Sequence, residues 1–330
     1  MSGFKYTKAT YRFISNYKDG KWDDGELTTD ENILMNESAG VIQYAQTVFE
    51  GLKAYRTPSD KIMLFRPIMH ARRLNKSAEV LGMPEYPTEK FMEAVIEVVK
   101  ANKEIIPRYG EGELYIRPTM FSTQPILGIK PAQEYQFRVF VSPVTSYFNT
   151  REGVNLCVSK YDSAAPNGTG HVKCGLNYAM SMQAIADAKK NGYDDCVYLD
   201  PATHTKIEEA SSANIIFVDD KGNIVVPKSK TVLQSITRQS IVEAAKSYGH
   251  MEVVEREVFV NELHNMKECF LCGTAATITP VKTLTFDKYT LKFNGAWNEE
   301  WVVTPKLIEM MRKIKMGSIS DRFGWLVIVE

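Results

Sequence analysis

Short alternating segments and segments with helical periodicity follow one another along the first half of the chain. Residues 61–65, KIMLF, form a short run of strand length after the turn residues TPSD, which predicts a β-hairpin. Apolar residues recur at helical spacing over 67–81 and again over 88–106, so two helices are predicted there. The strands 113–121 and 135–144 follow. This half therefore predicts a small α/β domain in which helices cover a sheet.

The second half of the chain is dominated by apolar runs of strand length. The runs that predict strands are 156–161, 195–200, 214–218, 223–227 and 269–273. Helical spacing predicts two helices, 177–190 and 237–248, each followed by a glycine that favours a helix end. The pattern indicates a larger, β-rich domain with covering helices.

A break in the pattern separates these halves. Residues 146–155 carry glycine and charge without periodicity, and a chain of 330 residues has room for two domains of ordinary size. We predict a small domain over 1–148 and a large domain over 149–330, with the boundary near Asn149 in a short interdomain loop. The predicted fold class is mixed, α+β.

Charge and composition exclude some classes of binding partner. Lysine plus arginine number 40 and aspartate plus glutamate number 40, so the formal charge is zero and no overall field attracts nucleic acid or an anionic membrane. No run approaches the ~20 apolar residues of a membrane span. The five cysteines lack the spacing of a disulfide framework, which favours a reducing compartment. We expect a cytoplasmic protein whose partners are small molecules.

Two motifs that resemble metal-binding or catalytic motifs are interpreted as structural. Cys269 and Cys272 form C-x-x-C, but they lie in a predicted strand and have no second pair to complete a zinc site. They are expected in the core, and no metal site is predicted. His171 has no Ser-His-Asp arrangement around it and is expected in a loop.

Lys173 is the strongest single candidate for chemistry. It lies in AAPNGTGHVKCGLNY, where Gly168, Gly170 and Gly175 permit close backbone approach. A lysine that forms a Schiff base needs such a setting, because its amine must be able to lose its proton. The alternative is a solvated lysine in a flexible loop.

Eight segments in order along the chain resemble one enzyme family. They are YAQTVFEGLKAYR, HARRL, LYIRP, HVKCGLNY, GYDDCVYLD, IEEASSANIIF, SITR and CGTAATITPV. Together these segments resemble the branched-chain amino-acid aminotransferases, which are pyridoxal-phosphate enzymes of fold type IV. Any one segment alone would be weak evidence, whereas their shared order and spacing are specific.

The resemblance implies a cofactor, pyridoxal 5'-phosphate, bound covalently by Lys173, whose freed amine then shuttles the proton during catalysis. It implies that Glu209 bonds the pyridine nitrogen and that Tyr178 bonds the ring oxygen, with Ser212 among the cofactor contacts. Glu208 is the competing carboxylate, and on a strand the two glutamates face opposite sides. A core position is the alternative for Tyr178.

The cofactor phosphate needs both a cation and amide donors. The resemblance implies Arg73 as the cation, with a solvated helix face as the alternative. A helix predicted to open at SITR offers N–H groups at Ile236 and Thr237, and Thr274 contributes from a turn. Ser235 stands where the family usually has glycine, and we expect it to tighten this helix start.

The family accepts both an apolar amino acid and glutamate. Tyr115 and Arg117 are two apart on a strand and face one side, so Arg117 is expected to bind the side-chain carboxylate of glutamate. The backbone N–H groups of Thr274 and Ala275 are expected to hold the α-carboxylate. The matching apolar lining consists of Phe49, Tyr147, Tyr178 and, across a dimer interface, Tyr44 and Ile129, with Val144 nearby. An ordinary core position is the alternative for Phe49.

The expected reaction is transamination of leucine, isoleucine and valine with 2-oxoglutarate, in amino-acid metabolism, by a homodimer or higher homo-oligomer. The alternatives are a D-amino-acid aminotransferase or aminodeoxychorismate lyase of the same fold, which should lack the Tyr115 and Arg117 arrangement, and a non-catalytic cofactor-binding protein. A hydride-transfer enzyme would need G-x-G-x-x-G, which the segment GTGHVK breaks at its sixth position.

Overall fold

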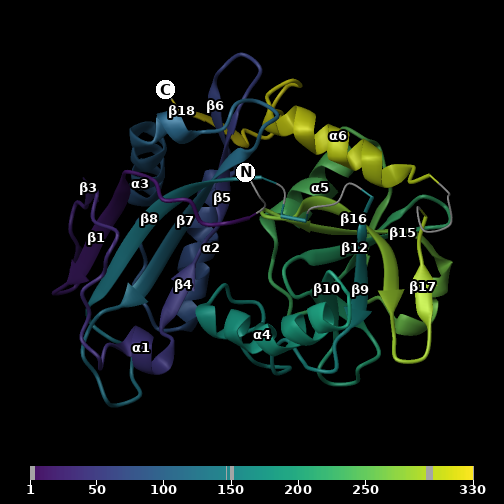
Figure 1. Cartoon of the computed structure of the whole chain (residues 1–330), viewed down its shortest axis with the longest axis horizontal. Coiled ribbons are helices and arrows are strands. Elements are labelled where there is room, and N and C mark those ends of the chain that lie inside the picture. Colours follow the sequence, from purple (N-terminus) through teal and green to yellow (C-terminus); the bar gives the residue numbers. More distant parts are fainter. Residues whose placement is uncertain (1–3, 146, 149–151, 295–299, 330) are drawn as a thin grey trace. The chain divides into compact units, whose positions relative to one another are not determined.

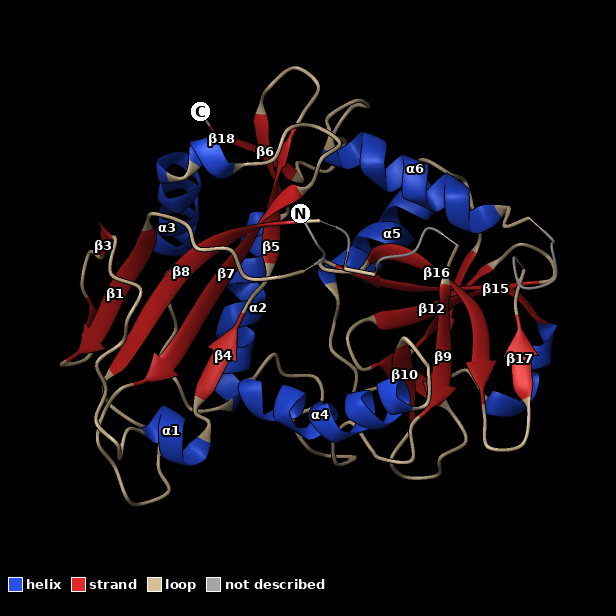
Figure 2. Cartoon of the chain, viewed as in Figure 1, coloured by secondary structure: helices blue, strands red, loops and turns tan. Residues whose placement is uncertain are grey.

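The computed structural model describes residues 4–145, 147–148, 152–294 and 300–329. The chain divides into two compact units. The first unit comprises Met1–Ser146, Val172–Leu176 and Ile314–Glu330, and the second comprises Tyr147–His171 and Asn177–Lys313. Each unit combines helices with a sheet (Figures 1 and 2), which confirms the predicted mixed α+β class.

The first unit is built on one nine-stranded sheet among the described residues. Its strands are β1 (Arg12–Lys18), β2 (Lys21–Trp22), β3 (Glu26–Thr28), β4 (Thr47–Phe49), β5 (Leu52–Arg56), β6 (Ile62–Phe65), β7 (Glu113–Ser122), β8 (Tyr135–Val144) and β18 (Leu326–Val329). They follow the order β18-β6-β5-β7-β8-β1-β2, with β3 on β1 and β4 on β7. The predicted hairpin is present as β5 and β6, and the pairs along this order are antiparallel.

Helices pack on this sheet through the apolar positions that predicted them. The helices of the first unit are α1 (Gly40–Tyr44), α2 (Pro67–Val80), α3 (Thr88–Ala101) and the short 3-10 helix η1 (Lys103–Ile105). Leu74 of α2 and Phe91 of α3 are fully buried in one core with Leu114 and Phe137 of the sheet. The predicted helix over 67–81 is confirmed to within one residue, because Gly82 adopts a positive φ of 64° that ends the helix.

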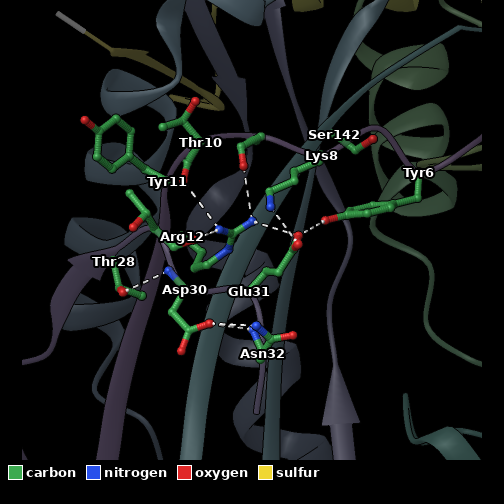
Figure 3. A network of polar contacts seen from close by, with 12 residues as sticks. Tyr6, Lys8, Thr10, Tyr11, Arg12, Thr28, Asp30, Glu31, Asn32 and Ser142 are labelled. Atoms are coloured by element: carbon green, nitrogen blue, oxygen red, sulfur yellow. Dashed lines mark hydrogen bonds and ion pairs between the residues drawn. The ribbon is translucent and has the colours of Figure 1, made fainter.

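A buried arginine fastens the chain segment that follows β3 (Figure 3). Arg12, which is 3% exposed, donates to the carbonyl oxygens of Thr29 at 2.6 Å and Ala9 at 3.1 Å. The Glu31 carboxylate lies 3.8 Å from Arg12 Nη2 through its Oε2 and 2.7 Å from Lys8 Nζ through its Oε1. A buried guanidinium must have its N–H groups satisfied, so this network fixes the segment against β1.

The second unit contains a closed ring of strands. Its strands are β9 (Val154–Val158), β10 (Asp195–Leu199), β11 (Ile207–Ala210), β12 (Asn214–Asp219), β13 (Ile224–Pro227), β14 (Val253–Arg256), β15 (Met266–Gly273), β16 (Thr277–Thr285) and β17 (Thr290–Lys292). The path runs β11-β10-β9-β16-β15-β12-β13-β14, and β11 also pairs with β12. That extra pairing closes β11, β10, β9, β16, β15 and β12 into a barrel, whose interior is filled by side chains.

Helices cover the barrel at several positions. They are α4 (Gly175–Lys190), α5 (Ile236–Ser247), α6 (Val303–Lys315) and the 3-10 helix η2 (Val260–Asn265). Ala184 and Ala188 of α4 pack on Cys196 and Tyr198 of β10. Cys269 and Cys272 are buried on β15, so the expected core positions are confirmed. Among the described helices, none is long and apolar enough to cross a membrane.

The predicted domains, 1–148 and 149–330, stay a prediction, and the compact units differ from them at three segments: 147–148, which belongs to the second unit, and 172–176 and 314–330, which belong to the first. Strand β18 pairs with β6, so the last described residues belong to the first unit. Val172–Leu176 also belongs to the first unit. The backbone of Cys174 in this segment forms an isolated antiparallel β-bridge with Val48. The proposed boundary at Asn149, and residues 146, 150 and 151 of the loop, lie outside the described residues.

A buried carboxylate caps the N-terminus of α6. Glu268 of β15 is 2% exposed and accepts hydrogen bonds from the backbone N–H groups of Val302, Val303 and Thr304, the last two at 2.9 and 2.8 Å. The Thr304 hydroxyl adds a bond of 2.6 Å. These N–H groups have no partner within the helix, so Glu268 caps α6 from the barrel.

Replacing Glu268 with alanine should lower the free energy of unfolding by about 3 kcal/mol, because the buried N–H groups lose their acceptor. Urea unfolding followed by circular dichroism would measure the loss. Glu255, which is exposed on β14, provides the matched control, and its change to alanine should cost less than about 0.5 kcal/mol. Equal stabilities of the two variants would contradict the capping role.

Candidate functional site

The backbone of Lys173 is attached to the first unit from both sides. Its carbonyl oxygen accepts a hydrogen bond of 3.1 Å from the N–H of Phe49, at the end of β4. Its own N–H donates to Ser77 Oγ of α2 at 3.0 Å. The neighbouring Cys174 is fully buried, and its backbone forms an isolated antiparallel β-bridge with Val48. The lysine that the sequence singled out is therefore held by a strand and a helix, unlike a lysine in a flexible loop.

The amine of Lys173 lies in a partly buried, charged environment. Its Nζ is 4.7 Å from the centre of the Phe49 ring. Burial, followed by the positive charge of Arg73, lowers the pKa of Lys173 to about 8, while the charge of Glu50 acts in the opposite direction. A substantial fraction of this amine is therefore neutral near physiological pH, which Schiff-base chemistry requires.

Arg73 is held by a carboxylate that the sequence analysis did not select. Glu50 is 0% exposed, and its two oxygens accept from Arg73 Nε at 2.6 Å and Nη2 at 2.8 Å. The Nδ1–H of His70 donates to the same carboxylate at 2.6 Å. The one signal for Glu50 in the sequence is an acidic residue between apolar residues in the segment YAQTVFEGLKAYR.

Charge balance within this cluster keeps Glu50 ionised. Burial alone would raise the pKa of Glu50, but the adjacent charge of Arg73 and the hydrogen bonds that the carboxylate accepts hold its pKa well below the usual value. Burial lowers the pKa of His70, which favours the neutral ring. The solvated helix face considered for Arg73 is wrong, because its side chain is only 13% exposed and is ion-paired.

A third cationic group of the first unit, Arg117, comes from β7. Arg117 Nη2 donates to the hydroxyl of Tyr115 at 2.8 Å, so the two side chains share one face of the strand as predicted. The Arg117 guanidinium lies 4.8 Å from the centre of the Phe49 ring. Its Nε is buried and has no hydrogen-bond partner among the described residues. Arg117 therefore retains a donor for an anionic ligand.

Glu208 and Glu209 on β11 point to different partners in the second unit. Glu209 accepts from Asn214 Nδ2 at 2.8 Å, and the two residues are also paired in register across β11 and β12. Glu208 is 2% exposed and accepts from the hydroxyls of Ser229, at 2.7 Å, and Thr231. Both hydroxyls bond Oε1 of Glu208, whose buried Oε2 has no hydrogen-bond partner among the described residues. Glu209 is the more exposed of the two glutamates.

Ser212 lies in the turn that joins β11 to β12. Its hydroxyl donates to Asp195 Oδ2 at 2.6 Å, and the hydroxyl of Ser211 also donates to Asp195. Asp195 is 3% exposed at the start of β10. This buried carboxylate therefore fixes the turn between Glu209 and Asn214.

Helix α5 begins one residue earlier than predicted, at Ile236. Ser235 is its N-cap, and the serine hydroxyl accepts from the backbone N–H of Arg238 at 3.2 Å. This cap agrees with the expectation that Ser235 tightens the helix start. Thr237 is buried in the first turn. The first N–H groups of α5 thus form a potential anion-binding end.

Thr274 and Ala275 lie in the turn between β15 and β16. Both residues are partly buried. The turn ends at Thr277, whose φ of 58° is unusual for a β-branched residue. Such a conformation persists only where the surrounding structure imposes it, so this turn has a defined shape.

Comparison with known proteins places the chain in a family. Residues 47–284 match the family described as amino-transferase class IV. The chain belongs to that family. It is 41% identical over 328 residues to the branched-chain-amino-acid aminotransferase of Helicobacter pylori strain J99, and the match covers 98% of this chain and 95% of that protein.

Solved structures agree with this assignment. The class IV aminotransferase described here is similar to the branched-chain amino acid aminotransferase of Escherichia coli, with a TM-score of 0.83, 27% identity, and coverage of 98% of this chain and 100% of that one. Another similar structure is a branched-chain amino acid aminotransferase complexed with N-(5'-phosphopyridoxyl)-L-glutamate, with a TM-score of 0.80, 28% identity and coverage of 98% and 99%. The predicted family and fold type are confirmed.

The remaining residues expected around the substrate of this aminotransferase differ in exposure. Tyr147 is 37% exposed and its ring contacts Phe148, while Tyr178 on α4 is also 37% exposed. A buried core position for Tyr178 is therefore wrong. Val144, at the end of β8, is buried.

Tyr44 and Ile129, which were expected at a dimer interface, lie on the surface of the first unit. Tyr44 is 39% exposed at the end of α1, and its hydroxyl donates to the carbonyl oxygen of Leu127. Ile129 is 91% exposed in the loop between β7 and β8, and Leu127 is 84% exposed. The contact of these residues with a second copy stays a prediction.

The environment of Lys173 predicts a distinctive labelling profile. In the folded, cofactor-free chain, acetylation of Lys173 by a trace of acetic anhydride should rise with pH to a midpoint near 8, because burial and Arg73 disfavour the ammonium form. Peptide mapping by mass spectrometry would measure the profile. In the denatured chain the midpoint should return to the ordinary lysine value of about 10.4. Identical midpoints in the two states would contradict the described environment.

Proposed function

We propose that this aminotransferase transfers the amino group of leucine, isoleucine or valine to 2-oxoglutarate and uses pyridoxal 5'-phosphate as cofactor. The observation that carries the proposal is Lys173 itself: its backbone is held by β4 and α2, and its partly buried amine has a lowered pKa beside two arginines. The branched-chain aminotransferases to which nearly the whole chain is similar support the substrate assignment.

The residues present have the chemistry that pyridoxal phosphate needs. The cofactor supplies an electron-accepting ring. A partly deprotonated lysine suits its aldehyde carbon, a carboxylate suits its pyridine nitrogen, and cationic and amide donors suit its phosphate. We assign the cofactor to Lys173, Arg73, Tyr178, Glu209, Ser212, Ile236, Thr237 and Thr274. Glu209, held by Asn214, would keep the pyridine nitrogen protonated.

Lys173 would serve as the general base. Its neutral Nζ would accept the proton from the α-carbon of the amino-acid substrate and, as an ammonium group, would deliver it to the aldehyde carbon of the cofactor. The hydrogen bonds of its backbone to Phe49 and Ser77 limit the positions that this nitrogen can reach. The pKa near 8 allows the same group to accept and donate a proton near neutral pH.

Substrate binding would use the partly buried cation of β7. We assign Arg117, supported by Tyr115, to the side-chain carboxylate of glutamate, since the guanidinium retains a buried Nε donor. The backbone N–H groups of Thr274 and Ala275 would hold the α-carboxylate. The apolar lining would consist of Phe49, Tyr147, Tyr178 and, from a second copy of the chain, Tyr44 and Ile129.

The proposal also covers the oligomeric state of the enzyme and its location in the cell. Exposed Tyr44, Leu127 and Ile129 provide an apolar surface that a second copy could cover, so we propose a homodimer or a higher homo-oligomer. Cysteines without a disulfide among the described residues and a balanced charge are in keeping with a cytoplasmic enzyme. We propose that it acts in branched-chain amino-acid biosynthesis.

The absorption of the bound cofactor tests the reaction class. Leucine should abolish the aldehyde-form band, and 2-oxoglutarate should restore it, because the amino group moves through the cofactor in two half-reactions.

Lys173→Ala should lower turnover by more than about a hundredfold, since both the covalent attachment and the general base are lost. Lys228→Ala, at an exposed position, is the matched control. Full turnover by the Lys173 variant would exclude the mechanism.

The same assay separates the alternatives. Loss of the band with D-leucine but not L-leucine would indicate a D-amino-acid aminotransferase. Release of pyruvate from aminodeoxychorismate would indicate the lyase. An unchanged spectrum with every amino acid would indicate a non-catalytic binding protein.

Arg117→Ala should slow the glutamate half-reaction about tenfold to a hundredfold more than the leucine half-reaction, because only glutamate presents a second carboxylate. Single-turnover rates of cofactor absorbance with each amino acid would measure the ratio. Arg108→Ala, at an exposed position of the same unit, should change neither rate. Equal losses with both substrates would show that Arg117 only supports Tyr115.

A further inference from the structure

Glu50 has no assigned role in the proposed reaction, yet it is a fully buried carboxylate of the first unit that accepts several hydrogen bonds. It is 0% exposed, and each of its oxygens takes part in a hydrogen bond from Arg73, at 2.6 and 2.8 Å. His70 Nδ1 adds a bond of 2.6 Å and the N–H of Gly51 one of 3.1 Å. Two parallel N–H···O bonds fix the plane of the guanidinium as well as its position.

The elements that hold this ion pair also hold Lys173. Glu50 directly follows Phe49, whose N–H binds the carbonyl oxygen of Lys173. Ser77, which accepts the N–H of Lys173, lies one helical turn after Arg73 on α2. A displacement of Arg73 on α2 or of Glu50 after β4 is therefore transmitted to the backbone that presents the lysine.

Charge provides a second connection between the pair and the amine. Arg73 disfavours a positive charge on Lys173, and Glu50 favours it. The other groups of the first unit that act on this amine are Tyr115 and Arg117 of β7, and His70 of α2 interacts with it too. With Glu50 ionised, its negative charge opposes the effect of Arg73 on the pKa of the lysine.

We propose that Glu50 is a positioning residue: its carboxylate fixes the guanidinium of Arg73 by a two-point ion pair and balances that charge beside the amine of Lys173. The inference deepens the proposed function, on which the catalytic meaning of Lys173 rests. Glu50 acts through Arg73 and Lys173 and touches no reacting atom in this role.

The two single variants should move the titration midpoint of Lys173 in opposite directions, and the double variant should restore it. In Glu50→Gln the charge of Arg73 is unbalanced, so the midpoint for acetylation of Lys173 in the cofactor-free full chain should fall by about one pH unit. In Arg73→Met the charge of Glu50 is unbalanced, and the midpoint should rise by a similar amount. The double variant carries neither charge and should return close to the parent value.

Glu113→Gln is the matched control. Glu113 is also a carboxylate of the first unit, and it pairs with buried Lys53 at 3.4 Å. This variant should leave the Lys173 midpoint unchanged, although loss of an ion pair will affect stability. A purely structural role for Glu50 would lower stability in the same way without a signed shift of the midpoint.

The result that overturns the proposal is a midpoint in Glu50→Gln that is unchanged or raised. If Glu50→Gln does not fold, comparing the double variant, which has no unpaired buried charge, with Arg73→Met isolates the effect of Glu50. Equal midpoints in that comparison also overturn the proposal. Because acetylation requires neither cofactor nor substrate, these outcomes are distinguishable from a failure of transamination.

Discussion

The hydrogen bonds that attach the backbone of Lys173 to β4 and α2 are the constraint on which the candidate chemistry depends. Residues 147–171 and 177–313 belong to the second unit, while the five residues around the lysine are part of the first. Phe49 and Ser77 hold the segment at Lys173 itself. A lysine side chain has many rotamers, so a general base of this kind needs its backbone fixed before its amine can be positioned.

Charge balance is the second requirement. The first unit brings Lys173, Arg73 and Arg117 toward the ring of Phe49 or the carboxylate of Glu50. Three uncompensated cations in a partly buried region would repel one another. Glu50 balances the charge of Arg73, while Arg117 keeps a buried Nε donor for an anion. An amine of lowered pKa can thus coexist with groups suited to phosphate and carboxylate.

The second unit prepares its groups through strand pairing. The pairing of β11 with β12 closes the barrel and places Glu209 directly opposite Asn214, which then binds it. Asp195 fixes the connecting turn through Ser211 and Ser212. Barrel closure and the position of the proposed pyridine partner are therefore consequences of the same register.

Local patterns in the sequence were sufficient for α2, the β5–β6 hairpin, the mixed fold class and the choice of Lys173, because periodicity, turn residues and motif spacing are properties of neighbouring residues. They also placed Tyr115 and Arg117 on one face of β7. Only the tertiary structure assigned β18 to the first sheet, attached Lys173 to β4 and α2, and paired Glu50 with Arg73. Those contacts join residues far apart in the chain, and no local pattern specifies which distant partner a buried carboxylate, a strand edge or a backbone N–H will find.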